Sequence, residues 1–363
     1  MADLSVNILG LHLRNPVLPA AGPPGWNGAA LLRCAAGGAG GLVSKTFSDE
    51  AAVVPHPNMA SVAGGFLNTE TWSELPPQQW IERELPLARS AGLPLIVSLG
   101  YTARQIAALA PKVKPFADAI ELSTHYLGDD PRPMIEAIEA AKAGAGLPTL
   151  VKLSPMRDMR AAAQAAGEAG ADGIVAINSF GPTLAIDIES GRPWMGSADG
   201  YGWMSGPALR PLAVRCVYDV ARTVDLPIIG VGGVSRGVDA IEMMMAGAWA
   251  VGICTEAILR GPGAFGRIAG EIERWLNAHN YASVTDIRGL ALRRIAGRVV
   301  RTQATPPAYD RDKCTGCELC ETSCVYQAIK VINKKAELDA ALCAGCGLCV
   351  TRCAPRALYW QES

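Results

Sequence analysis

The sequence predicts an α/β protein, a (β/α)8 TIM barrel followed by a small cysteine-rich domain, and three observations support this. The chain has 363 residues, which is long for one domain and short for three. Its first three hundred residues alternate continuous apolar runs with alanine-rich, helix-like stretches. Eight of the eleven cysteines lie in the last fifty residues. We therefore expect a barrel over residues 1–303 and a second domain over residues 304–363.

Eight apolar runs predict the barrel strands, because their polarity is continuous, as in parallel strands that are buried on both faces. They are Pro16–Ala21, Gly41–Thr46, Pro94–Leu99, Ala119–Thr124, Pro148–Leu153, Gly173–Asn178, Pro227–Val231 and Trp249–Cys254. Amphipathic segments between them predict helices at Asp130–Ala145, Arg157–Gly170, Pro207–Val224 and Arg236–Gly247. Eight such units in about 260 residues match the size of this barrel. A doubly wound sheet, the alternative, more often stops at about five or six strands.

Composition and charge exclude several classes of protein. Half of the residues are hydrophobic and 18% are charged, which supports a large core rather than a disordered chain. The 33 basic and 34 acidic residues give a net charge of −1, so no overall field attracts nucleic acid or an anionic membrane. The longest apolar run, Met243–Cys254, is shorter than the ~18 residues of a spanning helix. The N-terminus lacks the basic and apolar segments of an export signal. We expect a cytoplasmic protein.

Polar side chains are expected at the C-terminal ends of the strands, where barrels of this kind carry their active sites. Lys45, Lys152 and Asn178 each lie near the end of a predicted strand. After the seventh strand, Gly230-Val-Gly-Gly233 predicts a turn whose backbone N–H groups approach a phosphate. Ser235 stands where a dinucleotide fingerprint has its third glycine, which favours a mononucleotide. An ordinary tight turn is the alternative.

The cysteines of the tail form two runs with one spacing, C-x2-C-x2-C-x3-C, at residues 314–324 and 343–353. This spacing is typical of bacterial ferredoxins with two 4Fe–4S clusters, in which the fourth cysteine of each run binds the other cluster. One predicted cluster is held by Cys314, Cys317, Cys320 and Cys353, and the other by Cys343, Cys346, Cys349 and Cys324. Zinc sites are the alternative, but zinc ligands usually come as separated pairs. The tail is predicted to be a small α+β ferredoxin-like iron–sulfur domain.

The barrel resembles the dihydroorotate dehydrogenase and dihydropyrimidine dehydrogenase flavoprotein family over roughly Leu4 to Ala264. The motifs that carry the resemblance are Asn15–Gly22, Ser44–Thr46, Gly65–Asn68, Val151–Pro155, Ile177–Ser179, Met204–Pro211 and Gly230–Gly233. The tail is similar to the C-terminal ferredoxin extension of the dihydropyrimidine dehydrogenases. The resemblance implies an FMN-dependent oxidoreductase that acts on CH–CH bonds.

The resemblance also implies roles for single residues. Lys45 would act near the reactive side of the flavin, and Lys152 would stabilise negative charge at its N1–C2 edge. The other residues implied to bind FMN are Ala21, Gly22, Thr46, Asn178, Gly206, Gly230, Gly232, Gly233 and Thr255. Those implied to bind the substrate are Asn68, Asn178 and Ser179, together with Ser123, which replaces an asparagine of the family.

The chain departs from the family after the fourth strand. The family reads Glu-Leu-Asn-Leu-Ser-Cys-Pro there, whereas this chain reads Glu-Leu-Ser-Thr-His-Tyr over residues 121–126. Tyr126 stands at the position of the catalytic cysteine that some members carry, with His125 beside it. A tyrosine with a pKa of about 10 is protonated at neutral pH and suits proton delivery, while a histidine near about 6.5 can act either way. We expect Tyr126 or His125 to be the acid.

Together these features predict the reduction, or the reverse formation, of an activated C=C bond in a small cyclic amide or aromatic-type ring. Electrons would pass from a partner, a ferredoxin or an NAD(P)H-oxidising flavoprotein subunit, through two 4Fe–4S clusters to FMN. FMN N5 would give hydride to one carbon, and Tyr126 or His125 would protonate its neighbour. Trp194, Tyr201 and Trp203 in a long connection favour a flat ring, unless they pack the loop.

Two other functions are alternatives. One is a tRNA-dihydrouridine synthase-like enzyme, which would need a basic face for RNA. The other is an electron-transfer subunit whose barrel serves as a scaffold. We also expect a homo- or hetero-oligomer.

Overall fold

The computed structural model describes residues 1–123, 130–156, 158–300 and 302–361. The chain divides into two compact units, Met1–Ala296 and Gly297–Ser363. Within the described residues, no helix has both the length and the apolar character required to cross a membrane.

The first unit is built on an eight-stranded parallel sheet with the order β3-β16-β15-β10-β9-β8-β7-β4. The strands are β3 (Val17–Pro19), β4 (Leu42–Val43), β7 (Leu95–Leu99), β8 (Ala119–Leu122), β9 (Thr149–Leu153), β10 (Gly173–Ala176), β15 (Ile228–Val231) and β16 (Ala250–Ile253). Each predicted apolar run contains one of them. The two end strands approach each other, because the Gly40 N–H just before β4 donates to the Val17 carbonyl at 2.8 Å. The predicted (β/α)8 barrel is confirmed.

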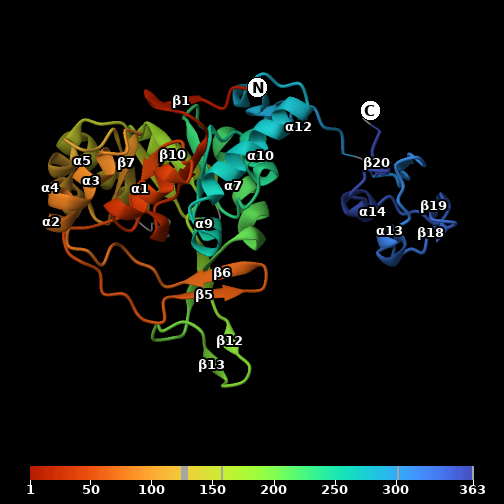
Figure 1. Cartoon of the computed structure of the whole chain (residues 1–363), viewed down its shortest axis with the longest axis horizontal. Helices are drawn as coiled ribbons and strands as arrows, with labels where there is room; N and C mark the ends of the chain where they lie inside the picture. Colours follow the sequence, from red (N-terminus) through yellow and green to blue (C-terminus); the bar gives the residue numbers. More distant parts are fainter. Residues whose placement is uncertain (124–129, 157, 301, 362–363) are drawn as a thin grey trace. The chain divides into compact units, whose positions relative to one another are not determined.

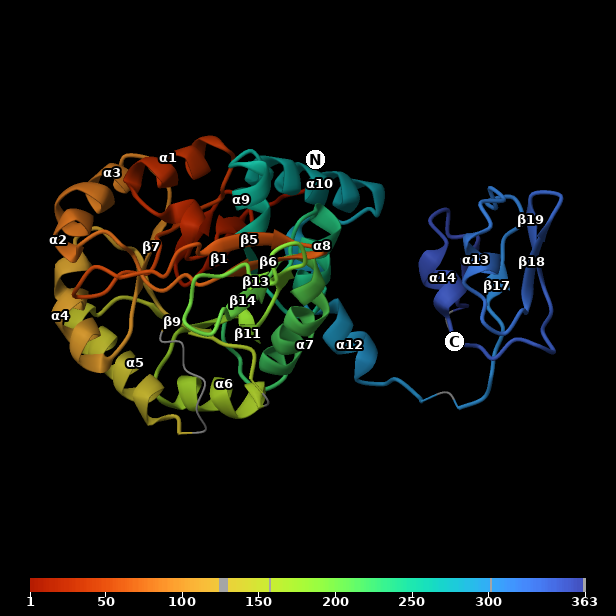
Figure 2. The same ribbon diagram turned by 90° about the horizontal axis from the view of Figure 1, so that it is seen from below.

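Helices surround this sheet as a ring (Figure 2). They are α1 (Gly28–Ala36), α2 (Pro77–Gln79), η2 (Trp80–Glu84), α3 (Leu85–Arg89), α4 (Ala103–Val113), α5 (Arg132–Ala145), α6 (Met159–Glu168), α7 (Arg210–Ala221), α8 (Gly237–Met245) and α10 (Ala264–Ala278). Their inner faces are rich in alanine, and Ala137, Ala141 and Ala163 are fully buried. Small side chains let the helices pack closely on strands whose residues are buried on both faces.

Two long connections form a second sheet that the sequence does not predict. Its order is β11-β14-β6-β5, and its strands are antiparallel. They are β5 (Met59–Val62), β6 (Gly65–Asn68), β11 (Phe180–Thr183) and β14 (Gly202–Ser205). Strands β5 and β6 lie at one end of the barrel, and the β12–β13 hairpin (Ile186–Asp187 and Arg192–Pro193) extends beyond them (Figure 1).

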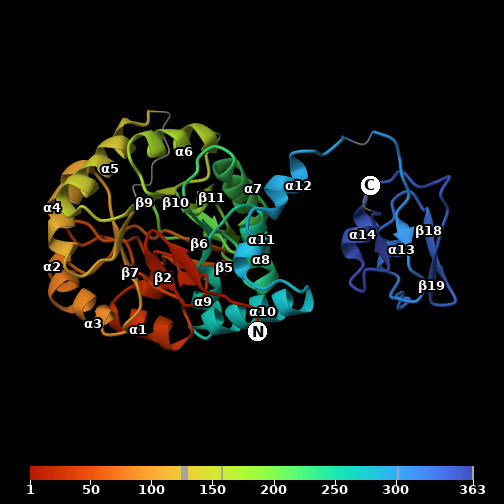
Figure 3. The same ribbon diagram turned by 90° about the horizontal axis from the view of Figure 1, so that it is seen from above.

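The opposite end of the barrel carries a short antiparallel hairpin of β1 (Val6–Ile8) and β2 (Leu11–Leu13) (Figure 3). The unit ends with α11 (Val284–Ile287) and α12 (Leu290–Ile295). Since β5 and β6 lie at the other end from β1 and β2, the sheet of β5, β6, β11 and β14 covers the end of the barrel where the functional groups of the strands are expected.

The second unit is small and has a repeated plan, in which one short helix begins after the second cysteine of each run and contains the third. Its helices are α13 (Leu319–Thr322) and α14 (Leu348–Arg352). Two antiparallel pairs complete it, β17 (Ala308–Tyr309) with β20 (Leu358–Tyr359), and β18 (Ile329–Ile332) with β19 (Lys335–Leu338). Its core is formed by Ile329, Ala336 and Leu358, against which five of the cysteines pack. This is the α+β unit that the tail predicts.

Candidate active site and cysteine cavities

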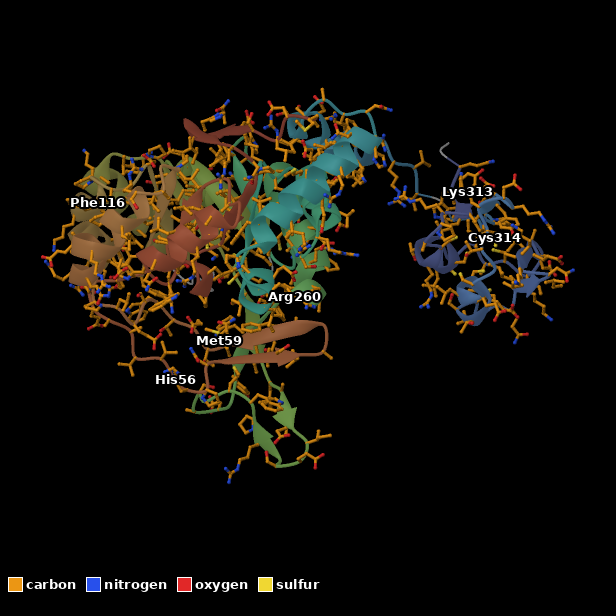
Figure 4. The ribbon with its side chains drawn as sticks, viewed as in Figure 1. His56, Met59, Phe116, Arg260, Lys313 and Cys314 are labelled. Atoms are coloured by element: carbon orange, nitrogen blue, oxygen red, sulfur yellow. The ribbon has the colours of Figure 1, made fainter. Side chains whose placement is uncertain are left out.

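A cavity of about 320 Å³ lies between the strand ends of the barrel and the second sheet. It gathers most residues that the sequence assigns to cofactor or substrate. These are Ala21, Gly22, Lys45, Thr46, Asn68, Ser123, Lys152, Asn178, Ser179, Gly206, Gly232, Gly233 and Thr255. Figure 4 shows Met59 on β5 and Arg260 at the end of α9 (Thr255–Arg260) on one side of the barrel, away from Phe116 in the turn after α4.

Several assigned residues lie elsewhere. Gly230 does not line this cavity, because it faces α8, where an added Cβ would meet the side chains of Ala248 and Met243 at 3.1 and 3.4 Å. His125 and Tyr126 lie outside the described residues.

The aromatic residues of the long connection do not line the cavity either. Trp194 and Tyr201 are about half exposed near the β12–β13 hairpin, and the Trp203 ring packs against Gly181. Because these three aromatic residues lie outside the cavity lining, they give no support to the prediction of an aromatic-type substrate ring.

Lys45 is held in an ion pair that the sequence analysis missed. Its Nζ lies 2.5 Å from Glu70 Oε2 and 4.0 Å from Glu74 Oε2. The other Glu70 oxygen accepts a hydrogen bond from Asn58 Nδ2 at 2.5 Å. Glu70 lines the cavity. The spacing Asn68-x-Glu70 was the available clue, since alternate residues of an extended segment point to the same side.

Asn68 is fixed at the end of β6 by two backbone groups. Its Nδ2 donates to the Trp203 carbonyl at 3.0 Å, and its Oδ1 accepts the Glu70 N–H at 3.2 Å. A carboxamide has two donor hydrogens and two acceptor lone pairs. Among the contacts of the described residues, one donor and one acceptor of this rigid amide are therefore left for a ligand in the cavity.

Lys152 is buried on β9 beside Glu121 of the neighbouring strand β8. Its Nζ donates to the Ala21 carbonyl at 3.4 Å and lies 3.8 Å from Glu121 Oε1. That carboxylate oxygen is buried, and the described residues offer it no hydrogen-bond partner. Burial raises the pKa of Glu121, and the Lys152 charge opposes the shift. Lys152 thus carries a positive charge into the cavity from a site shielded from water.

Glycine turns form another part of the cavity. Gly206, Gly232 and Gly233 have φ values of +89°, +127° and +74°. A Cβ at Gly233 would lie 2.7–2.9 Å from Arg210, so only glycine fits there. Asp239 fixes the turn, because it accepts hydrogen bonds from Ser235 N at 3.1 Å and Arg236 N at 2.9 Å and pairs with Arg210.

Two further hydroxyl groups in the cavity were not assigned from the sequence. Ser205 Oγ lies 2.8 Å from Thr255 Oγ1, which links the second sheet to α9. Tyr101 also lines the cavity, and burial raises its pKa, so the phenol keeps its proton at neutral pH. Ser205 belongs to the Met204–Pro211 motif but received no role from it, and no pattern in the sequence set Tyr101 apart from ordinary loop residues.

In the second unit, the cysteines line two small cavities of about 20 Å³ each. One is lined by Cys314, Cys317, Cys320 and Cys353, and the other by Cys324, Cys343, Cys346 and Cys349. This is the division that the spacing predicts. In the part of the chain that is described, no three His, Cys, Asp or Glu side chains converge as a single metal ion would require.

The cysteine sulfurs accept hydrogen bonds from their surroundings. Cys353 Sγ accepts from the Ala357 and Leu358 N–H groups at 3.2 and 3.5 Å. Cys343 Sγ accepts from Gly345 N at 3.4 Å. The Tyr309 hydroxyl bonds to Cys314 and lowers the pKa of that thiol. Such contacts stabilise thiolates, the form of cysteine that binds iron.

Comparison with known proteins identifies both units. The sequence model of the family described as dihydroorotate dehydrogenase matches residues 3–276, and a 4Fe-4S binding domain model matches residues 306–329. The catalytic subunit of dihydroorotate dehydrogenase B (NAD(+)) from Methanothermobacter thermautotrophicus is 38% identical over 305 residues, covering 79% of this chain and 98% of that protein.

The proteins of the same name from Methanocella arvoryzae and Pyrococcus abyssi are 40% and 36% identical. Each match covers 80% of this chain, and 98% and 99% of the relative, respectively. The chain is thus an oxidoreductase that acts on CH–CH bonds, and it belongs to the dihydroorotate dehydrogenase family, with a 4Fe–4S binding domain in its C-terminal unit.

Proposed function

We propose that this chain reduces, or forms, an activated C=C bond of a small cyclic amide, using FMN in the barrel cavity and two 4Fe–4S clusters in the second unit. The observation that carries the proposal is the cavity itself. It combines two buried lysines, the fixed amide of Asn68 and the glycine turns at the strand ends.

The residues of the cavity fit FMN. At Gly232 and Gly233 an added Cβ would lie 2.7 Å from Ala213 and Arg210, so the turn beside the cavity requires glycine, and such glycine turns suit a phosphate. Gly22 and Cys254 both line the cavity, and an added Cβ at Gly22 would approach Cys254 Sγ at 3.1 Å, so a larger residue would be crowded at this position. FMN, when bound, would supply hydride transfer to or from a substrate carbon.

The protein groups would orient the substrate and balance charge. The Lys152 ammonium would stabilise negative charge on the reduced cofactor, a task that suits a fixed cation in a shielded site. Asn68 would offer its remaining donor and acceptor to an amide edge of the substrate. Ser123, Asn178 and Ser179 line the same cavity and would complete the binding set, with the Asn178 Oδ1 already accepting the Ser179 N–H at 2.9 Å.

The proton donor remains Tyr126 or His125. Both follow Ser123, which is buried at the end of β8 and lines the cavity. The donor must reach the carbon next to the one that exchanges hydride.

The second unit would carry electrons between the cavity and a partner. Each of its two cavities presents four cysteines, the ligand number of a 4Fe–4S cluster. The relatives are named as catalytic subunits of an NAD(+) enzyme. We therefore propose a partner that oxidises NAD(P)H, or a ferredoxin, in a hetero-oligomer without nucleic acid or membrane.

Anaerobic purification of the full chain tests the proposal. We expect about one FMN and about eight iron atoms per chain, as two clusters of four require. Dithionite-reduced clusters should bleach the flavin, and a cyclic amide with an activated double bond should restore its absorbance. A chain without flavin or iron after reconstitution contradicts the proposal.

A further inference from the structure

We infer that Glu70 makes the substrate end of the barrel cavity selective for an uncharged ring with an N–H group, and against a ring that carries a carboxylate. The inference rests on the proposed function, in that it needs a ring substrate in this cavity. It concerns the substrate class, which the family match alone leaves open.

The first step is that the positive charge of Lys45 is already balanced by carboxylates of the protein itself. Its ammonium lies 2.5 Å from Glu70 Oε2, and Glu74 stands at 4.0 Å. Lys45 is 5% exposed, so the pair is shielded from water and salt. A second carboxylate that approached Lys45 would also meet the negative charge of Glu70.

The second step is that Glu70 cannot easily turn away. Its Oε1 accepts from Asn58 Nδ2 at 2.5 Å, and its backbone N–H donates to Asn68 Oδ1 at 3.2 Å. Its side chain is 10% exposed. An ionised carboxylate has about four acceptor positions, and the two contacts to Lys45 and Asn58 use two of them. Glu70 therefore offers a fixed acceptor to the cavity that it lines.

The third step concerns the other cations that line the cavity in the described ranges, which are Lys152 and Arg260. Lys152 lies 3.8 Å from Glu121 Oε1 and bonds to the Ala21 carbonyl. Arg260 ends α9, the helix that begins at Thr255 near the glycine turns proposed for the phosphate. At the substrate end, each described lysine is thus accompanied by a carboxylate.

The arrangement suits a cyclic amide or imide. A ring N–H can donate to Glu70, while the neighbouring ring carbonyl accepts from the free hydrogen of Asn68 Nδ2. Dihydroorotate, the compound in the names of the relatives, carries a carboxylate on its ring. Buried like charges destabilise binding unless each has its own partner. This chain is therefore expected to prefer the uncharged ring.

Uracil and orotate provide a matched pair of probes, because orotate is uracil with a carboxylate on the ring. Each is titrated into the full-length, FMN-loaded protein, and binding is followed by the shift in flavin absorbance and by calorimetry. We expect uracil to bind at least about tenfold more tightly, a difference of about 1.4 kcal/mol. Glu70→Gln should shift the ratio of the two dissociation constants toward orotate by a similar factor.

Glu74→Gln is the control, since Glu74 lies near the same lysine but does not line the cavity. Glu74→Gln should change the ratio of the uracil and orotate dissociation constants by less than about twofold. Such a change corresponds to less than the ~0.5 kcal/mol typical of surface substitutions. If the Glu70→Gln variant does not retain FMN, the ratio of the uracil and orotate dissociation constants of the wild-type protein tests the inference by itself.

The outcomes separate the two proposals. If the FMN-loaded protein prefers orotate, binds neither ring, or keeps its ratio in Glu70→Gln, the assignment of Glu70 is wrong while the proposed function stands. A chain that holds no FMN overturns both.

Discussion

Glu121 and Lys152 face each other from adjacent barrel strands, with Glu121 Oε1 3.8 Å from Lys152 Nζ and both side chains at most 5% exposed. In the part of the chain that the structure describes, Glu121 Oε1 has no hydrogen-bond partner. The negative charge of Glu121 therefore opposes the field that Lys152 projects into the cavity, and the pair sets the charge that a cofactor there experiences.

Glu121→Gln should raise the midpoint potential of bound FMN, because Lys152 then stabilises the reduced cofactor without opposition. We expect a rise of about 30 mV for the two-electron couple, equivalent to about 1.4 kcal/mol. The difference from wild type should shrink as the pH falls through the raised pKa of Glu121, since the protonated group carries no charge. Redox titration at several pH values measures both effects, and an unchanged potential at high pH contradicts the prediction.

Gly233→Ala should weaken FMN binding at least about tenfold, because the added Cβ would lie within 3.0 Å of Arg210 and disturb the turn. Gly146→Ala is the matched control. Gly146 also has a positive φ, but an added Cβ meets nothing within 4 Å, and the residue caps α5 outside the cavity. It should cost about 1 kcal/mol of stability without a change in FMN affinity. Fluorescence titration of FMN into the flavin-free protein distinguishes the two variants.

Tyr126→Phe should slow reoxidation of the reduced flavin by a ring substrate about a hundredfold, the lower range for loss of a general acid. Reduction of the flavin through the clusters should not change, because no proton is delivered to the ring in that step. Stopped-flow measurement separates the two half-reactions. His125→Gln and Tyr101→Phe are the comparisons, and a larger loss in either one assigns the acid to that residue instead.

Tyr309→Phe should lower the potential of the cluster proposed at Cys314, Cys317, Cys320 and Cys353. The lost hydrogen bond to Cys314 is worth about 1 kcal/mol, or about 40 mV for a one-electron couple. Tyr326 lines the other cavity, so Tyr326→Phe is the matched control. EPR-monitored titration should show one shifted and one unshifted cluster in Tyr309→Phe. Equal shifts of both clusters would argue against the assignment.

Burial of two barrel thiols predicts a loss of stability in alkali. Burial raises the pKa of Cys34 to about 12 and of Cys216 to about 11, from 9.0 for an ordinary thiol. The folded chain therefore holds these protons more tightly. Their contribution to the free energy of unfolding is complete below about pH 9 and falls as the pH rises toward 11, by up to about 1.4 kcal/mol per pH unit for each thiol.

Denaturant unfolding between pH 8 and about pH 10.5 measures this loss. Cys216→Ala should decline less steeply than wild type, since it lacks one of the buried barrel thiols. Burial also raises the pKa of Cys254, to about 11, and this third thiol adds to the decline in both proteins. The same slope in both proteins would contradict the assignment.

The barrel strands were predictable because each is a continuous apolar run bounded by turn residues, and the cysteine division followed from spacing alone. The second sheet was not predictable. Asn68 and Trp203 pair across 135 residues of sequence, and no local pattern encodes which loop strands meet. Glu70 was missed for the same reason, because a single carboxylate in a polar loop acquires meaning only when folding brings Lys45 to it.

Gly230 is the opposite case, because the sequence assigned it to the FMN site and the structure does not place it in the cavity lining. The Gly230-Val-Gly-Gly233 motif indicates a turn but not which of its members face a ligand. Position 230 lies within β15 and packs against α8, whereas the cavity lining begins at Val231, the last residue of that strand, and continues into the turn at Gly232 and Gly233.

The antiparallel pairing of β6 with β14 also limits how this enzyme can evolve. Asn68 lies opposite Trp203, and side chains alternate along both strands. A one-residue insertion or deletion in β6 before Asn68 would turn Asn68 away from the cavity, and one in β14 would reverse the side chains of that strand instead. New substrate preferences should therefore arise by exchange of side chains at constant loop length, whereas the β12–β13 hairpin beyond this pairing is free to vary in length.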